Sequence, residues 1–166
     1  SITILNRSNL NKITSFGGQG SYYQHNLWGD QSDIAVSPDG TKLLVASKGA
    51  SSVCLHNISS GGAYISNSCT KVGGRPNGRP NQNYDRSWWK AWDYGGSYPD
   101  YHYDPYGVAF DSSGNIYVAD GPKHIIKKFN SSGTYVSKYG SRDCWAAGGD
   151  FCYPRGVFVD NSDKIW

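Results

Sequence analysis

The sequence predicts an all-β fold assembled from repeated four-stranded antiparallel units. Three stretches of the 166-residue chain, 33–47, 106–120 and 155–166, are versions of one another. Each reads as a short apolar strand, a four-residue turn and a second apolar strand. Self-similar units of this kind are typical of repeat architectures, in which every unit packs on its neighbours. No window keeps a helical apolar period, and no apolar run approaches the length of a membrane span.

The composition agrees with turn-rich β-structure. Glycine contributes 21 residues and charged residues are only 17% of the chain. The formal net charge is +3, with lysine and arginine scattered along the sequence, so binding of nucleic acid is not favoured. None of the four cysteines lies in a CxxC pair, which disfavours a zinc knuckle.

The clearest unit occupies 105–140. Its first two strands are joined by a turn at 111–114 and its last two by a turn at 130–133, with a polar loop at 121–124 between the hairpins. Asn, Asp, Ser and Gly fill both turns because they accept left-handed or Asx-turn geometry at little cost. The predicted strands are 105–110, 115–120, 125–129 and 134–140.

This unit resembles the NHL repeat of β-propellers. The family pattern runs Pro-x-Gly-Val-Ala-x-Asp, then Gly-x-Ile-Tyr-Val-Ala-Asp, an Asn-His-Arg-Ile-like segment and Phe-Asp-x-x-Gly. Lys123 and Ile125 depart from its Asn and Arg, and the first unit is looser, with Ser47 in place of Asp120. The matching residues are Pro105, Gly107, Val108, Ala109, Asp111, Gly114, Ile116, Tyr117, Val118, Ala119, Asp120, His124, Ile126, Phe129 and Gly133. The resemblance implies the fold and says little about activity.

Aligning the repeats along the chain indicates that 1–166 is a partial NHL-type β-propeller, with enough strands for about three blades. Closed propellers usually have four to eight blades, so we expect that this chain does not close a ring by itself. It is then part of a six-bladed or larger propeller in a longer chain, or it is completed by another chain, as in a three-plus-three dimer. Open blade edges also favour self-assembly, into a closed dimer or a fibre. The segments are a half blade at 1–20, a blade at 33–73, an aromatic insert at 74–104, a blade at 105–140 and a half blade at 154–166.

The aromatic insert is the first candidate binding site. Tyrosine, tryptophan and arginine are enriched where protein interfaces gain most of their energy, and aromatic rings also stack on sugar faces. The insert therefore predicts a protein or carbohydrate partner. The alternative is a local aromatic core that caps the propeller and holds a brief helix around 87–92. The candidate residues are Arg86, Trp88, Trp89, Trp92, Tyr94, Tyr101 and Tyr103.

Cysteines and glycosylation sequons favour a secreted, extracellular protein. Asn6, Asn57 and Asn130 each begin an Asn-x-Ser sequon at the same repeat position, the turn between third and fourth strands. We expect glycans there, on one face, away from the aromatic insert. The alternative is a cytosolic protein with buried free thiols. Proximity favours the disulfides Cys54–Cys69 and Cys144–Cys152, although three pairings are possible in principle.

The sequence contains no recognisable active-site motif. Some NHL-like propellers are enzymes, such as the lyase that cleaves peptidyl-hydroxyglycine. The positions of that family's metal histidines correspond here to Ser32, Tyr106 and Arg155, which argues against a carried-over zinc site. Three other histidines are candidate zinc ligands, but nothing in their spacing requires a metal: His25, His102 and His124.

We therefore predict no catalytic residue, no metal and no cofactor, since no nucleophile elbow, phosphate loop or paired-carboxylate motif is present. The favoured function is an extracellular, glycosylated, non-enzymatic binding or structural assembly module with no membrane role. The alternatives are an enzyme that uses the propeller mouth, resembling peptidyl-hydroxyglycine amidating lyase, and an RNA-binding NHL domain.

Overall fold

The computed structural model describes most of the predicted strands and, of the aromatic insert, residues 102 and 104. No helix in the described part of the chain has the length and apolar character of a membrane span. The brief helix expected around 87–92 lies outside the described residues. The described residues are 2–5, 8–16, 31–48, 51–59, 63, 65, 69–73, 102, 104–140 and 151–166.

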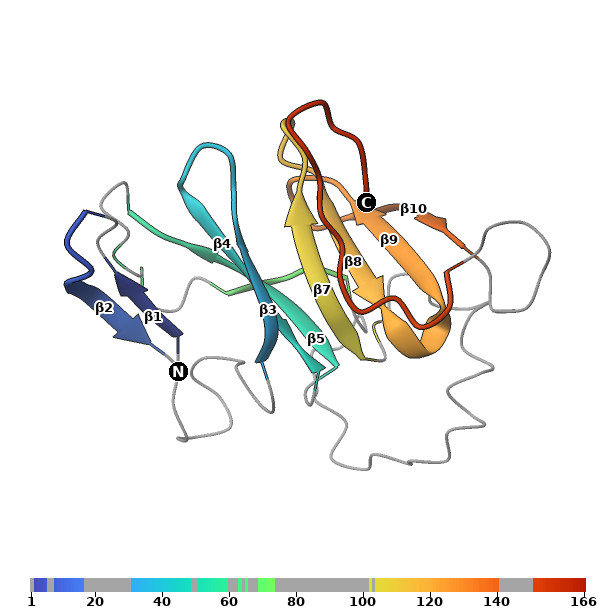
Figure 1. The fold of residues 1–166 in the computed structure, drawn as a ribbon, viewed down its shortest axis with the longest axis horizontal. Helices are drawn as coiled ribbons and strands as arrows, with labels where there is room; N and C mark the ends of the chain where they lie inside the picture. Colours follow the sequence, from blue (N-terminus) through green and yellow to red (C-terminus); the bar gives the residue numbers. More distant parts are fainter. Residues whose placement is uncertain are drawn as a thin grey trace.

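Two four-stranded antiparallel sheets dominate these residues and confirm the predicted all-β fold (Figure 1). The strands of each sheet pair in chain order, as in a propeller blade. The first blade contains β3 (Gln31–Val36), β4 (Lys42–Ser47), β5 (Ser52–Asn57) and β6 (Thr70–Lys71). The second contains β7 (Pro105–Phe110), β8 (Ile116–Asp120), β9 (Ile125–Phe129) and β10 (Tyr135–Tyr139), with the 3-10 turn η2 (Gly121–Lys123) before β9.

Smaller pieces of sheet flank the two blades. At the N-terminal side, β1 (Ile2–Leu5) pairs antiparallel with β2 (Lys12–Phe16). At the C-terminal side, 154–166 forms a hairpin-like segment with an antiparallel bridge between Val159 and Ile165. Figure 1 shows these pieces on opposite sides of the molecule, beside the first and second blade respectively.

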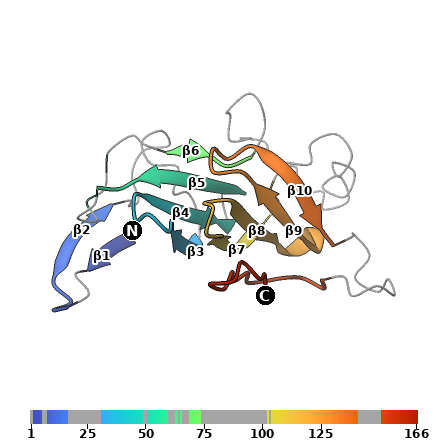
Figure 2. The same ribbon diagram turned by 90° about the horizontal axis from the view of Figure 1, so that it is seen from above.

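The blades pack face to face, and their core lies between the sheets (Figure 2). Strands β4 and β8 are buried along nearly their whole length, which explains why KLLVAS and IYVAD read as continuous apolar runs. Each fully buried aliphatic side chain stabilises the fold by about 1.5–3 kcal/mol. The shared core contains Leu44, Ala46, Val53, Leu55 and Val72 from the first blade and Val108, Ile116, Val118 and Phe129 from the second.

The other face of the second blade has its own smaller core. Residues that alternate with the first set point away from the first blade and pack on the C-terminal segment. Val157 is the buried residue that this segment contributes, with Val159 and Ile165 packed around it. The stacking of one sheet on the next therefore continues past the second blade.

The inner strand of each repeat unit is its first strand: β3, β7 and the start of the C-terminal segment. These strands approach closely because Asp33 and Gly107, at equivalent repeat positions, are hydrogen-bonding and small respectively. Asp33 on β3 accepts a hydrogen bond at Oδ2 from the backbone N of Val108, at 2.9 Å. On the other side of β7, a Cβ added to Gly107 would lie 2.7 Å from the Cα of Gly156. Only glycine fits at 107, because real Cβ atoms do not approach a backbone that closely.

The strand-connecting turns repeat one geometry. Asp111, Asn130 and Asp160 each accept, through Oδ1, the backbone N–H groups two and four residues ahead. Three residues beyond each of them the backbone is left-handed, with φ of +78° at Gly114, +82° at Gly133 and +59° at Asp163. These are the Asx turns that the sequence predicts from its Asp, Asn and Gly residues.

The fourth strand of the first blade is short, since β6 holds only two residues. Pairing with β5 continues for one bond beyond β6, from the backbone N of Val72 to the carbonyl O of Val53 at 3.0 Å. The edge is instead fixed by a disulfide, described below.

The Gly107 contact generates a prediction. We expect Gly107→Ala to lower the free energy of unfolding by about 1–3 kcal/mol, because the new methyl group must push 156–157 away from β7. Gly156→Ala is the matched control: a Cβ there meets nothing within 4 Å, so its effect stays within about 0.5 kcal/mol. Urea unfolding of the two variants checks this, and equal losses would contradict the close approach.

Candidate functional site

The blades have two ends with different chemistry. The turn end is defined by the turns at 37–41, 111–115, 130–134 and 160–164. The connection end is defined by Lys48, the η2 turn and the segments 104–106 and 151–155. Figure 1 shows the β3–β4 and β7–β8 turns at one end of the sheets and η2 at the other. Longer connections gather at the second end, so it is the natural place for a binding site.

The sequence-predicted sites fall partly within the described residues. All seven candidates of the aromatic insert lie outside them, as do Asn6 and His25. Asn57 ends β5 opposite Lys42, and Asn130 opens the β9–β10 turn. The register therefore places these two sequon asparagines at the turn end, where Asn57 is exposed and Asn130 is half-buried.

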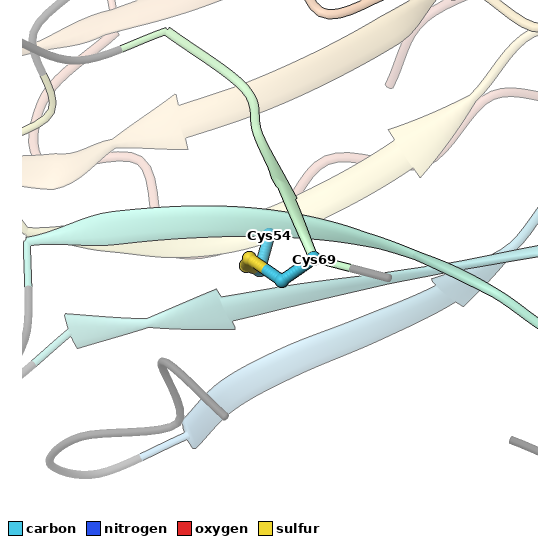
Figure 3. Close-up of a disulfide and its surroundings, with 2 residues drawn as sticks. All are labelled: Cys54 and Cys69. Atoms are coloured by element: carbon cyan, nitrogen blue, oxygen red, sulfur yellow. A yellow bond between two sulfur atoms is a disulfide. The ribbon is translucent and has the colours of Figure 1, made fainter. Parts of the chain in front are cut away.

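One predicted disulfide is present. Cys54 on β5 is bonded to Cys69, just before β6, with their Cα atoms 5.5 Å apart (Figure 3). Cys152 is also disulfide-bonded. Its predicted partner, Cys144, lies outside the described residues, so that pairing stays a prediction.

A cluster of aromatic and basic side chains occupies the connection end. At its centre the Tyr106 ring lies against Gly121, where an added Cβ would be 2.7 Å from two ring carbons. The Lys48 Nζ is 4.7 Å from the centre of that ring and the Arg155 Cζ is 5.9 Å away. Three different repeat units therefore meet on one aromatic side chain. We call Lys48, Tyr106, His124, Tyr153 and Arg155 the Tyr106 cluster.

Tyr153 and His124 form the outer part of the cluster. The Tyr153 ring centre is 6.2 Å from that of Tyr106 and 5.7 Å from that of His124, which it meets edge-on. The backbone N of Tyr153 donates a hydrogen bond to the Nδ1 of His124, at 3.0 Å. That bond makes Nδ1 an acceptor, and the proton of a neutral His124 is then on Nε2. His124 has a left-handed backbone, with φ of +57°.

A buried ion pair between Lys127 and Asp120 holds the start of β7, and so Tyr106, in place. The Lys127 Nζ lies 2.8 Å from the Asp120 Oδ2, and both side chains are almost fully buried. The other oxygen of Asp120 accepts the backbone N–H of Asp104 at 3.3 Å, and the backbone N of Gly121 donates to the Asp104 carbonyl at 3.4 Å. These bonds fix the start of β7, and with it Tyr106, against η2.

Charge and burial shift several pKa values here. Burial alone would raise the pKa of Asp120, but the charges of Lys127 and Lys123 outweigh it and lower the pKa. The half-buried Asp104 has its pKa raised by burial. Interaction with the Tyr106 hydroxyl raises the pKa of Lys48, and burial raises that of Tyr153. The raised pKa of Lys48 keeps its amine positively charged at neutral pH, beside the guanidinium of Arg155.

His102 is a second buried feature of this region. Its Nε2 lies 2.8 Å from the Val72 carbonyl and its ring centre 5.4 Å from that of Phe129. Burial, followed by the charge of Lys127, lowers its pKa to about 3. His102 is thus a neutral residue of the interblade core, and the structure does not bring it together with His124 as a pair of metal ligands among the described groups.

The three positions that correspond to metal histidines in the resembled lyase stand at the starts of inner strands. Tyr106 and Arg155 lie together in the Tyr106 cluster, while the Ser32 Oγ donates to the Pro105 carbonyl at 2.6 Å. The structure therefore places these positions at one end, with Ser, Tyr and Arg side chains that are not the usual nitrogen ligands of zinc.

The sequence did not single out the Tyr106 cluster as a binding site. The sequence did contain a signal for the cluster, because Tyr106 and Arg155 occupy the same repeat position and both have large side chains. Lys48 and Tyr153 carry no such signal, since they lie in connections that the repeat pattern does not describe.

Comparison with known proteins supports the fold. A family model described as a beta-propeller repeat (SBBP) matches residues 94–119, which include β7 and most of β8. No curated protein matches this chain. The match to the family model overlaps the first half of the clearest repeat, 105–140, and does not distinguish an NHL repeat from other propeller repeats.

One solved structure shares the fold at low identity, and two others are similar more weakly. Hydrazine synthase of Kuenenia stuttgartiensis is 14% identical, with a TM-score of 0.52, and the match covers 90% of this chain and 31% of that one. A gluconolactonase of Xanthomonas campestris is 14% identical (TM-score 0.46, covering 81% and 33%). The calcium-binding protein regucalcin of Agrobacterium tumefaciens is 12% identical (TM-score 0.43, covering 68% and 31%). The chain spans about a third of the length of each, and the likeness concerns the fold alone.

His102 generates a prediction about pH. Its pKa is lowered from 6.5 to about 3 in the folded state, so the unfolded chain binds its proton first as the pH falls. The stabilisation is complete above pH 6.5 and is lost progressively toward pH 3, by about 1.4 kcal/mol for each pH unit. We expect His102→Gln, which keeps a neutral donor, to reduce this loss. Denaturant unfolding between pH 7 and 4.5 measures it. Parallel pH profiles of the two proteins would contradict the assignment.

Proposed function

We propose that this chain is part of an extracellular, NHL-type β-propeller that acts as a non-enzymatic binding module, with an acidic carbohydrate chain as its partner. The ligand binds at the connection end, on the Tyr106 cluster. The observation that carries the proposal is the convergence of Lys48 and Arg155 on the Tyr106 ring from separate repeat units. The aromatic insert joins β7 at this same end and is proposed to extend the surface.

The chemistry of the cluster suits an acidic sugar. An aromatic ring offers an apolar face to the C–H groups of a sugar ring, and Tyr153 has 43% of its surface exposed. The guanidinium of Arg155 is able to donate two parallel hydrogen bonds to a carboxylate or sulfate, while Lys48 supplies a second positive charge. Among the described residues, the half-buried Asp104 is an acidic group whose charge acts on Lys48, so Arg155 is the main cation that the cluster offers to an anionic ligand.

The extracellular setting is proposed from the cysteines and sequons. The Cys54–Cys69 disulfide is typical of oxidising compartments. Two sequon asparagines at the turn end leave the connection end clear of glycans. A binding face and a glycosylated face on opposite ends of the blades suit a secreted recognition module.

The enzyme and RNA-binding alternatives have weaker support. The positions that correspond to the metal histidines of the resembled lyase hold Ser32, Tyr106 and Arg155. The likeness to hydrazine synthase and gluconolactonase is at 14% identity and concerns the fold alone. An RNA-binding surface needs a broad basic stripe, whereas the net charge is only +3.

The binding proposal is tested with two oligosaccharides of equal length, pentagalacturonate and maltopentaose. We expect calorimetry to show binding of the acidic one only, weakened by salt. Arg155→Ala should weaken it roughly tenfold or more, because a hydrogen bond to a charged group is lost. Lys164→Ala is the matched control: Lys164 also stacks on an aromatic ring, 4.1 Å from that of Trp166, but at the turn end. An equal loss of affinity for pentagalacturonate in both variants, or equal binding of both sugars, would contradict the proposed site. Binding of a protein partner and of neither sugar would show that the ligand is not a carbohydrate.

Glycosylation has a separate test. We expect glycopeptide mass spectra of the protein secreted from eukaryotic cells to show glycans on Asn57 and Asn130, and on Asn6. Asn57 is exposed, and Asn130 keeps its Nδ2 free of the turn, which uses Oδ1. Asn130→Asp keeps that Oδ1 acceptor while removing the attachment atom, so it should abolish modification without unfolding. Three unmodified asparagines would refute the proposal.

A further inference from the structure

The first blade differs from the second at one pair of buried positions. In the repeat, Cys54 and His56 of β5 correspond to Lys127 and Phe129 of β9. Lys127 forms an ion pair with Asp120, and Phe129 belongs to the core between the blades. The first blade has Ser47 where the second has Asp120 and thus lacks that carboxylate. A histidine and a cysteine have replaced a core aromatic and a paired lysine.

Strand geometry brings a third group to these two. Residues two apart in a strand point to the same face, so Cys54 and His56 share one side of β5. The antiparallel register pairs Cys54 with Lys71 and Leu55 with Thr70, and one further step places Cys69 opposite His56. The Sγ atoms of both cysteines and a ring nitrogen of His56 all lie within 4.8 Å of one another. Cys54 and His56 are 2% and 0% exposed, and Cys69 is half-buried.

We propose that these three residues form a zinc site that becomes available when the Cys54–Cys69 disulfide is reduced. A Zn²⁺ ion with bonds of about 2.3 Å to sulfur and about 2.0 Å to nitrogen holds such ligands roughly 3.5–4 Å apart. The ring nitrogen of His56 already lies within 4.8 Å of both sulfur atoms, and these two atoms, bonded here, must separate to that distance on reduction. Two thiolates and one imidazole are ligands that zinc prefers, and three protein ligands leave a fourth position for water. The half-buried Cys69 gives the ion its path from solvent.

An external thiol supplies the electrons that reduce the Cys54–Cys69 disulfide. Two equivalents of a monothiol, or one of a dithiol, break the Sγ–Sγ bond and are oxidised to their own disulfide, leaving two cysteine thiols. Zn²⁺ then displaces one proton from each thiol and binds the neutral imidazole. In the reverse direction an external disulfide exchanges with the two thiolates: the Sγ–Sγ bond forms again, the external disulfide takes up two protons and leaves as two thiols, and the ion is released. The site therefore couples zinc binding to the thiol–disulfide balance around the protein.

The test measures zinc binding by the 166-residue chain carrying Cys144→Ser and Cys152→Ser, so that Cys54 and Cys69 are its only thiols. We expect no stoichiometric binding in the oxidised form. After reduction and removal of the reductant under nitrogen, we expect one Zn²⁺ per chain by calorimetry, with release of two protons. Co²⁺ in place of zinc should give the intense near-ultraviolet band of cobalt–thiolate bonds.

His56→Phe separates the site from simple thiol binding, because it installs the residue that the second blade carries at this position. It should keep the fold by circular dichroism and lose the 1:1 stoichiometry. His102→Gln removes another buried histidine and should bind zinc as the parent does. Equal zinc binding in His56→Phe, or binding unaffected by reduction, would overturn the proposal. A reduced chain that unfolds and is not refolded by zinc would overturn it as well.

Discussion

Close contact between neighbouring inner strands is the constraint on which the rest of the structure depends. β3 reaches β7 through the Asp33 carboxylate and the Ser32 hydroxyl, both bonded to backbone groups of β7. On the other side, Gly107 lets the C-terminal segment approach to backbone contact. Larger residues at 107 would separate the sheets and open the core behind them. A gap of even 1 Å there would forfeit much of the dispersion energy of the core residues.

The same constraint explains where the candidate binding site is. Inner strands that run side by side bring their first residues together, and these include Tyr106 and Arg155. The cluster is therefore a product of packing between repeats, and no single repeat contains it. The Asp120–Lys127 pair adds rigidity beneath it, at a desolvation cost that its 2.8 Å contact and the extra hydrogen bond from Asp104 offset.

Some elements could be predicted from sequence because they depend on local chemistry. The Asx turns follow from Asp111, Asn130 and the glycines three residues on, and the Cys54–Cys69 bond follows from two cysteines on adjacent strands of one hairpin. The Tyr106 cluster could not be predicted, because it requires the distance between residues from three units.

Each sheet is built from one unbroken stretch of chain, and this has a consequence for how the molecule forms. In the second blade every hairpin closes over only a few residues, so its strands find one another at little entropic cost. In the first blade the return from β5 to β6 spans 58–69 and is secured by a covalent bond between sulfur atoms. We therefore expect the second blade to form first, and formation of the Cys54–Cys69 bond to complete the first blade, which packs against it.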